Sequence, residues 1–309
     1  MAMDNWFACE LHCHTYHSDG DFTVNTLLKT AKERLLDGIC LTDHNTISGW
    51  YEVENNFTPV VLKGMELTTY YGHMLTLGID EYVEWCDALP DNIDEKMKFV
   101  HSHSGLVGMA HPFQAGTPIC TGGHWDYNVS DYKLVNYLEV WSEGNPFMNS
   151  ANVKAYKLWV SLLDKGFKIT PTFGRDWHNS ENDIYPCACT YLNCDSNQLT
   201  PIKMKNAIKN GKTTVSAGPL FYFKTVDNRV IFTTDFKRCK KFKNAPVFEP
   251  KIIKLLTNNN TVLAEIPFSS NAVLSNINFE FNHYYRAELY GAINENENCL
   301  IAFTAPVYY

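Results

Sequence analysis

The chain lacks an excess of positive charge, and this weighs against a long nucleic acid as its partner. Its 309 residues include 26 Lys and Arg against 34 Asp and Glu, which gives a formal net charge of −8. Proteins that bind a nucleic-acid backbone need clustered positive charge. We therefore expect no long nucleic-acid partner. A short nucleotide still fits, because bound cations dominate the field around a small anionic substrate.

Long hydrophobic runs and a secretory leader are also missing. No stretch approaches the roughly 20 apolar residues that span a bilayer, and no charged segment followed by an apolar one opens the chain. We therefore expect no membrane partner and a cytoplasmic location. The ten cysteines are scattered, and the tightest pair is Cys187 with Cys189. Because no Cys-X-X-Cys pair exists, a zinc ribbon is disfavoured and free thiols are favoured.

Strand and helix patterns alternate up to about residue 220. Hydrophobic residues make up 45% of the chain and charged residues 19%, enough apolar material for a sizeable core. Apolar runs predict strands, and apolar residues at helical spacing predict helices. The expected strands are 7–12, 39–42, 60–62, 106–110, 137–141 and 169–173, and the expected helices are 24–36, 93–101 and 152–165. This repetition predicts an α/β fold with a parallel sheet, open or closed into a barrel.

The pattern changes near residue 220. The remainder contains short strand-like runs separated by clusters of Asn, Asp and Gly, without a convincing helix. Such a pattern predicts a small all-β domain that resembles a sandwich. We therefore expect two domains, residues 1–220 and 221–309.

Polar residues that can bind metal follow the predicted strands. His12 and His14 alternate on a strand, so both imidazoles face the same side and can meet one ion. Asp176 and His178 repeat this spacing after a later strand. Further candidates are His44, Glu66 and His111 at strand ends, Glu139 within a strand, and Asp19, which a turn at Gly20 could bring back to the end of the first strand. In an α/β barrel the carboxyl ends of the strands carry the active site, and this donor set suits zinc, manganese or iron.

Several of these segments resemble a known family. The run Leu11–Gly20 resembles the opening motif of the PHP family, the polymerase and histidinol phosphatase superfamily. Thr42–His44, Gly64–Glu66, Ala110–Pro112 and Gly174–His178 resemble its later motifs in the same order, so the resemblance spans roughly residues 9 to 180. It implies a distorted barrel of about seven strand–helix units with a site for two or three divalent ions.

The second half of the chain is similar to one branch of this family. Leu138–Trp141, Gly211–Pro219 and Phe303–Tyr308 resemble segments of the CehA/McbA-like metallohydrolases. Members of that branch append a small β-domain, as the strand pattern after residue 220 also predicts.

The resemblance implies a ligand set. The first ion would be held by His12, His14, Glu66 and Asp176; the second by Glu66 as a bridge, with His111 and Glu139; the third by Asp19, His44 and His178. Position 139 varies in the superfamily among Glu, His and Cys.

Two further residues are candidates for catalysis. His73 lies where the superfamily often has His, and we expect it to contact substrate or to transfer a proton. Relatives usually carry a small residue where this chain has Arg175. Its guanidinium would either clamp an anionic oxygen of the substrate or pair with a nearby carboxylate.

The resemblance implies a metal-dependent hydrolase. The leading hypothesis is a phosphoesterase that acts on a small anionic substrate, a phosphate ester, through a metal-bound hydroxide. One alternative is a carbamate, ester or amide hydrolase that uses the same metal site. A second alternative is a non-catalytic ligand-binding protein in which the β-domain makes the contacts.

Overall fold

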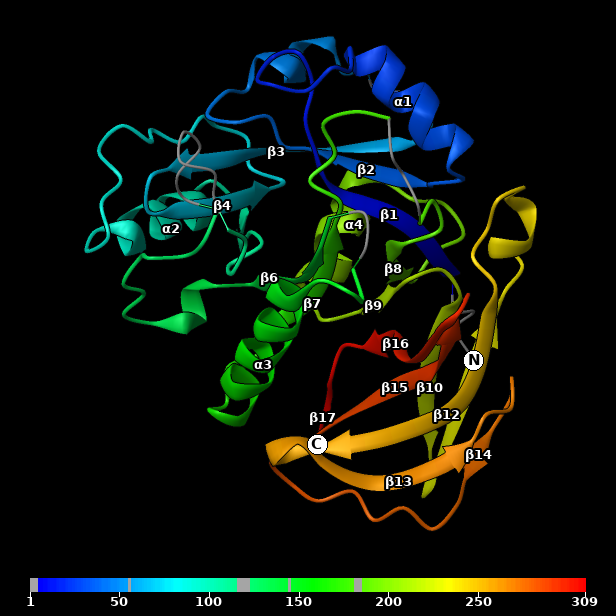
Figure 1. The fold of residues 1–309 in the computed structure, drawn as a ribbon. Helices are drawn as coiled ribbons and strands as arrows, with labels where there is room; N and C mark the ends of the chain where they lie inside the picture. The colour runs from blue at the N-terminus through cyan, green and yellow to red at the C-terminus, as the bar shows by residue number, and fades with distance from the viewer. Residues whose placement is uncertain (1–4, 55–56, 116–122, 144–145, 181–184) are drawn as a thin grey trace.

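The computed structural model describes residues 5–54, 57–115, 123–143, 146–180 and 185–309. Its first part is a mixed α/β unit (Figure 1). In chain order this unit contains β1 (Asn5–Cys13), α1 (Val24–Glu33), β2 (Gly38–Leu41), β3 (Val60–Thr69), β4 (Gly72–Leu77), α2 (Ile93–Ser102), β5 (Leu106–Met109), β6 (Tyr137–Ser142), α3 (Ser150–Asp164), β7 (Thr170–Gly174), β8 (Cys189–Cys194), α4 (Pro201–Lys209) and β9 (Thr213–Ser216). No helix among the described residues is both long and apolar enough to cross a membrane.

The helices form where capping residues precede apolar positions at helical spacing. The Thr23 side chain accepts a hydrogen bond from the amide of Thr26 and caps α1. The buried residues of this helix are Val24, Leu27, Leu28 and Ala31, which form one face. Asn149 caps α3 in the same way through the amide of Ala151.

The sheet of this unit is mixed, so the expectation of a parallel sheet is wrong in part. β1, β2 and β3 are parallel, and so are β5, β6 and β7. Between them β4 runs antiparallel to both β3 and β5, because Tyr70 and Tyr71 reverse the chain directly after β3. β8 and β9 extend the sheet in antiparallel fashion beyond β1.

Closure of these strands into a barrel stays a prediction. The hydrogen-bonded ladders run in one path from β13 to β7 and do not join β7 to β1. Just beyond the end of β7, Trp177 forms an isolated parallel bridge with Cys13 at the end of β1. The two segments therefore touch at their carboxyl ends.

α4 packs against the amino ends of the strands. Met204 of α4 lies where a side chain at Gly38, the first residue of β2, would have to stand. The hydroxyl of Thr170, the first residue of β7, donates to the carbonyl of Ile208 in α4. Met204 and Ile208 belong to one buried cluster with Leu62 and Tyr137 of the sheet. The carboxyl ends of the strands lie away from this helix.

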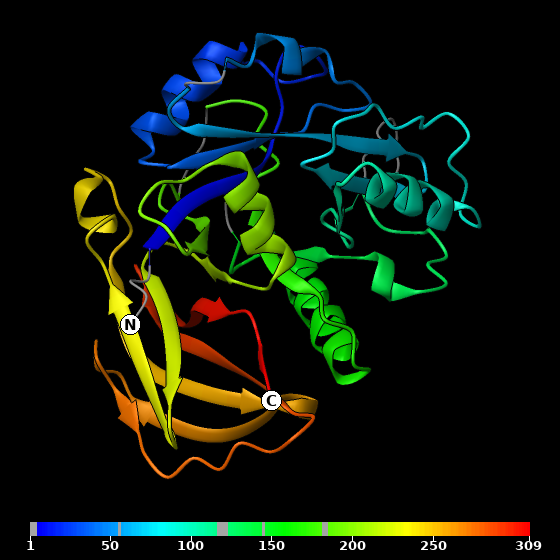
Figure 2. The same ribbon diagram turned by 180° about the vertical axis from the view of Figure 1, so that it is seen from behind.

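The second part of the chain consists of strands and short 3-10 turns. Its strands are β10 (Leu220–Val226), β11 (Arg229–Asp235), β12 (Phe248–Thr257), β13 (Thr261–Pro267), β14 (Val273–Leu274), β15 (Tyr284–Ile293), β16 (Asn296–Thr304) and β17 (Val307–Tyr308). β10, β11 and β14 form a small sheet of their own. It lies against the sheet of β12, β15 and β16 (Figure 2), and Phe221, Phe232 and Leu289 belong to the same buried core.

The two parts share one sheet. β16 pairs antiparallel with β9, through Ala302 with Ser216 and Thr304 with Thr214. The strand order is therefore continuous from β12 and β15 through β16 and β9 to β1. The expected boundary near residue 220 lies at the start of β10, just after β9, and the pairing of β9 with β16 connects the parts on either side of it. The division into two domains stays a prediction.

A buried arginine also joins the parts. Arg286 of β15 is fully buried, and its guanidinium lies 5.3 Å from the ring centre of Tyr156 and 5.5 Å from that of Trp159, both in α3. It pairs with Glu288, which in turn accepts a hydrogen bond from the Tyr156 hydroxyl. This contact fixes α3 against the strands of the second part.

Candidate metal centre

The metal-ligand candidates gather at the carboxyl ends of the strands. The main chain brings the segments together: the amide of His14 donates to the carbonyl of Trp177 at 3.0 Å, and the amide of Trp177 donates to the carbonyl of His12 at 3.0 Å. His44, after β2, forms an isolated bridge with Glu66 of β3. The structure therefore places residues 12–14, 44, 66 and 176–178 around one point.

The innermost group consists of His12, His14, Glu66 and Asp176. The Nε2 atom of His12 lies 3.1 Å from Oε2 of Glu66 and 3.3 Å from Oδ1 of Asp176. The corresponding distances from Nε2 of His14 are 3.3 and 3.0 Å. All four atoms are buried, yet none has a hydrogen-bond partner among the described residues. Because buried polar atoms are almost always satisfied, this group fits a divalent cation.

His111 and Glu139 form a second group with His12. Oε1 of Glu139 lies 2.9 Å from Nδ1 of His12, and its Oε2 accepts the amide of His111 at 3.0 Å. Glu139 therefore orients a ligand candidate, while each carboxylate oxygen keeps a second lone pair. Nε2 of His111 lies 3.3 Å from Oε1 of Glu66, so Glu66 faces both groups through different oxygens.

Asp19, His44 and His178 form a third group with His14. Oδ1 of Asp19 lies 3.1 Å from Nε2 of His178 and 3.5 Å from Nε2 of His44. The rings of His44 and His178 each lie 4.2 Å from the ring of His14. The side chain of Asp19 is 58% exposed, so this group forms the solvent side of the site.

Gly20 and Asp43 shape the loop that carries Asp19. A Cβ at Gly20 would lie 2.6 Å from the carbonyl carbon and oxygen of His14, so only glycine permits this return of the chain. Asp43 accepts hydrogen bonds from the amide of Thr15 at 2.6 Å and from the hydroxyl of Ser18 at 3.0 Å. These contacts hold the loop against β2.

Burial and neighbouring charges shift the pKa values of the imidazoles and carboxylates of the site. Burial lowers the pKa of His14 to about 3, so its ring is neutral and keeps its lone pair. Burial also opposes protonation of His111, but Glu66 and Asp176 raise its pKa to about 9. Burial alone would raise the pKa of Glu66, whereas His12 and His44 hold it well below its usual value. A divalent cation that enters would replace the proton on His111 as the counter-charge.

His73 lies beside this centre on β4. Its Nδ1 is 3.0 Å from Oε1 of Glu66, and its ring packs edge-on against His111 with the ring centres 5.0 Å apart. It also forms a possible ligand group with His44 and Glu66. The structure therefore brings His73 to the site, in contact with Glu66 and His111.

Arg175 is next to the centre in sequence, and its guanidinium packs over the rings of Phe173 and Trp177. It donates to the carbonyl of Ala188 at 3.0 Å, and it lies 5.6 Å from the ring centre of Phe173. Its Nε is 3.4 Å from Oε2 of Glu10. This position matches the expectation that Arg175 pairs with a nearby carboxylate.

Glu10 is a buried residue beside the centre that was not predicted from the sequence. It is fully buried in β1, two residues before His12, and contacts Arg175 through both the main chain and the side chain. A signal was present, because a carboxylate inside an otherwise apolar strand run must have a partner when it is buried.

Gly174, the last residue of β7, leaves the space that His12 and Glu139 occupy. A Cβ at this position would lie 1.8 Å from Oε1 of Glu139 and 2.7 Å from Cβ of His12. We expect Gly174→Ala to destabilise the fold by about 1–3 kcal/mol and to lower metal content, as measured by urea unfolding and elemental analysis. Gly166→Ala is the control, since nothing lies within 4 Å there and only its φ of +88° causes strain. Equal metal content in both variants would contradict the expectation.

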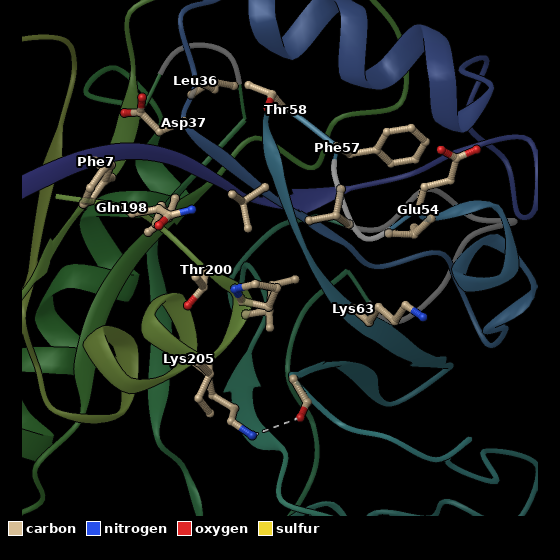
Figure 3. Close-up of a pocket in the computed structure, with 18 of the residues that line it drawn as sticks. Phe7, Leu36, Asp37, Glu54, Phe57, Thr58, Lys63, Gln198, Thr200 and Lys205 are labelled. Carbon is tan, nitrogen blue, oxygen red and sulfur yellow. Dashed lines mark hydrogen bonds between the residues drawn. The ribbon is translucent and has the colours of Figure 1, made fainter. Parts of the chain in front are cut away.

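A cavity of about 830 Å³ lies near the amino ends of β2 and β3, away from the metal candidates (Figure 3). Apolar and amide side chains such as Phe7, Leu199 and Gln198 line it. Its Lys205 donates to the carbonyls of Gly78 and Ser104 at 3.4 and 3.0 Å. Lys63 and Lys205 extend in different directions from the wall. Its described lining residues offer no convergent set of acids, bases or ligands.

Comparisons with known proteins find similarity in sequence and in fold. The model of the family described as the PHP domain matches residues 10–143. An uncharacterized protein of Methanocaldococcus jannaschii is 30% identical over 125 residues, which are 36% of this chain and 69% of that protein.

Solved structures add a likeness in fold. A two-domain protein from Bacteroides vulgatus, containing a predicted PHP-like metal-dependent phosphoesterase, covers 98% of this chain and 96% of its own, at a TM-score of 0.54 and 13% identity. A Bifidobacterium adolescentis protein, provisionally described as a metal-dependent phosphoesterase, covers 55% of this chain and 87% of its own, at a TM-score of 0.39 and 19% identity. The first match extends over both parts of the chain and shows a common fold.

Proposed function

The chain belongs to the PHP domain family, and from this we propose that it is a metal-dependent phosphoesterase acting on a small phosphate ester. The observation that carries the proposal is the innermost group: four buried donor atoms of His12, His14, Glu66 and Asp176 that have no hydrogen-bond partner among the described residues. The β-strands after residue 220 support assignment to the CehA/McbA-like branch, and the bridge at Cys13 and Trp177 supports a distorted barrel.

The three groups would hold two or three ions. His12, His14 and Asp176 would hold the first, and Glu66 would bridge to a second, since its two oxygens face different imidazoles. The second would also involve His111 and Glu139; the third would be held by Asp19, His44 and His178. When bound, divalent ions lower the pKa of coordinated water from about 15.7 toward about 7 and neutralise charge on the phosphoryl oxygens. Zinc, manganese and iron all suit this set.

The chain's own residues would position the substrate and move a proton. Water that has given one proton to the solvent would attack phosphorus in line, and the bond from phosphorus to the leaving oxygen would break. Protonated His73 would give its proton to the departing oxygen and would regain one from the solvent. Its Nδ1 contacts Glu66, and its Nε2 is buried with no hydrogen-bond partner among the described residues. Arg175 would pair with Glu10, and the Glu10 carboxylate would in turn accept hydrogen bonds from main-chain amides next to the site.

The proposal is tested by metal analysis and a hydrolysis assay on the same purified sample. The substrates are an aryl phosphate, a phosphodiester and an aryl carbamate, each with and without added manganese. We expect a phosphate ester to be hydrolysed, the activity to be lost with chelator, and manganese to restore it. For each site, metal at 100 times its Kd should also stabilise the fold by about 2.7 kcal/mol, measured as a higher Tm.

Other outcomes would change the assignment. Cleavage of the carbamate alone would favour the CehA/McbA-like alternative, in which the same site attacks a carbonyl carbon. Metal binding without any hydrolysis would favour a ligand-binding protein. Failure to bind metal under any loading condition would contradict the metal centre itself.

A further inference from the structure

We infer that Glu10 is a positioning residue that sets the separation between the main-chain segments bearing His12 and Asp176. The inference rests on the proposed function, since these two residues are ligands only if the centre binds metal. Among the contacts of the described residues, Glu10 meets the main chain of His12 and not the imidazole of His12 or the carboxylate of Asp176. Its effect would pass through backbone amides.

One oxygen of Glu10 joins two strands. Oε1 accepts hydrogen bonds from the amides of Leu11 at 2.9 Å, His12 at 3.2 Å and Arg175 at 2.7 Å. His12 is itself a ligand candidate, and Arg175 directly precedes Asp176. Hydrogen bonds from amides to a buried carboxylate are stronger than those between neutral groups. A fully buried carboxylate therefore holds the end of β1 at a fixed distance from the end of β7.

The main-chain hydrogen bonds described above between the two segments lie beyond Glu10, where the amide of His14 donates to the carbonyl of Trp177 and the amide of Trp177 donates to the carbonyl of His12. Among the described residues, no β-ladder joins β1 to β7. Their segments form one isolated β-bridge, between Cys13 and Trp177. The pairing of β1 with β2 also shifts register between Glu10 and Cys13. Glu10 acts where the regular hydrogen bonds of β1 are interrupted.

The backbone at Asp176 is also unusual. Its φ is +52°, in the left-handed region, which is uncommon outside glycine and which Asp and Asn adopt more readily than other residues. The Glu10 carboxylate fixes the amide immediately before Asp176. The Arg175 side chain is fixed as well, through Ala188, Tyr185 and Glu10. Together these contacts orient the Asp176 carboxylate toward His12 and His14.

The test uses cobalt alone as the probe of the full-length chain. Metal-free wild-type protein and Glu10→Gln are titrated with Co²⁺ while the visible absorption, which reports coordination geometry, is recorded. Gln keeps the size of the side chain and one acceptor oxygen but loses the charge. We expect Glu10→Gln to bind Co²⁺ about 10–100-fold more weakly, the usual effect of losing a residue that orients a ligand, and to change the absorption spectrum.

Glu288→Gln is the matched control. Glu288 is 2% exposed and pairs with a buried arginine, as Glu10 does, but it lies in β15. We expect this variant to be less stable and to keep the wild-type cobalt spectrum and affinity. An equal change in both variants would show a general loss of stability and overturn the inference. So would a Glu10→Gln variant with wild-type affinity and spectrum.

A double variant covers the case in which Glu10→Gln fails to fold. Adding Arg175→Met removes the buried positive charge that lies beside position 10, so folding is expected to recover. The hydrogen bonds from the amides to position 10 remain weakened, so the altered cobalt spectrum and affinity should persist. A wild-type spectrum in the double variant would overturn the inference. Failure of the wild-type protein to bind cobalt is a different result, because it contradicts the proposed function rather than the role of Glu10.

Discussion

Asp176→Asn should lower kcat/KM by more than about a hundredfold, beyond the 10–100-fold typical of residues that only orient a ligand. Oδ1 of Asp176 is the atom that contacts the Nε2 atoms of both His12 and His14, at 3.3 and 3.0 Å. An amide in its place removes the negative charge that the cation needs. The fold should survive, because Asn tolerates the left-handed backbone that this position adopts.

Three measurements check this result: kcat/KM for an aryl phosphate, metal content, and the urea unfolding midpoint. Asp195→Asn is the matched control, since its side chain is 80% exposed and pairs with Lys212 at the surface. We expect the control to keep its activity and metal. Full activity in Asp176→Asn would exclude the innermost group as the metal site.

Arg286→Met should destabilise the protein by about 3–5 kcal/mol, the cost of leaving one member of a buried ion pair without its partner. Arg286 is fully buried and pairs with Glu288, which is 2% exposed. Met fills similar volume but leaves the carboxylate of Glu288, among the described residues, with the hydroxyls of Tyr156 and Tyr290 as partners. The loss also removes the contact between the guanidinium and the rings of α3.

The free energy of unfolding in urea measures this effect. Lys251→Met provides the comparison, because Lys251 pairs with Glu297 at 2.7 Å with both side chains largely exposed. Exposed pairs contribute about 0–1 kcal/mol. A loss in Arg286→Met no larger than that of the surface variant would mean that the buried pair does not stabilise the contact between the two parts.

The sequence predicted the elements whose pattern is local. Residues with helical spacing, such as Val24, Leu27 and Leu28, identified α1, and the predicted helices 93–101 and 152–165 correspond to α2 and α3. The alternation of His12 with His14 and of Asp176 with His178 identified residues that the structure brings within reach of one another. These features depend on neighbours in the chain, which a single sequence records.

Features that depend on distant contacts were not predicted. β4 follows a turn formed by Tyr70 and Tyr71, and tyrosine is not typical of turns. The reversal of the chain after β3 and the mixed sheet therefore could not be predicted from the sequence. The direction of the Arg175 side chain depends on Glu10, 165 positions earlier. The pairing of β9 with β16 likewise joins segments that nothing local connects.

That pairing has a consequence for the order in which the chain can fold during synthesis. The outer edge of β9, at Thr214–Ser216, receives its partner only when Ala302–Thr304 have left the ribosome, nearly 90 residues later. At ~5–20 residues per second the edge waits on the order of ten seconds. An open strand edge can pair with other chains. During that interval a chaperone, or a later strand of the same chain, would have to shield the open edge of β9 from pairing with other chains.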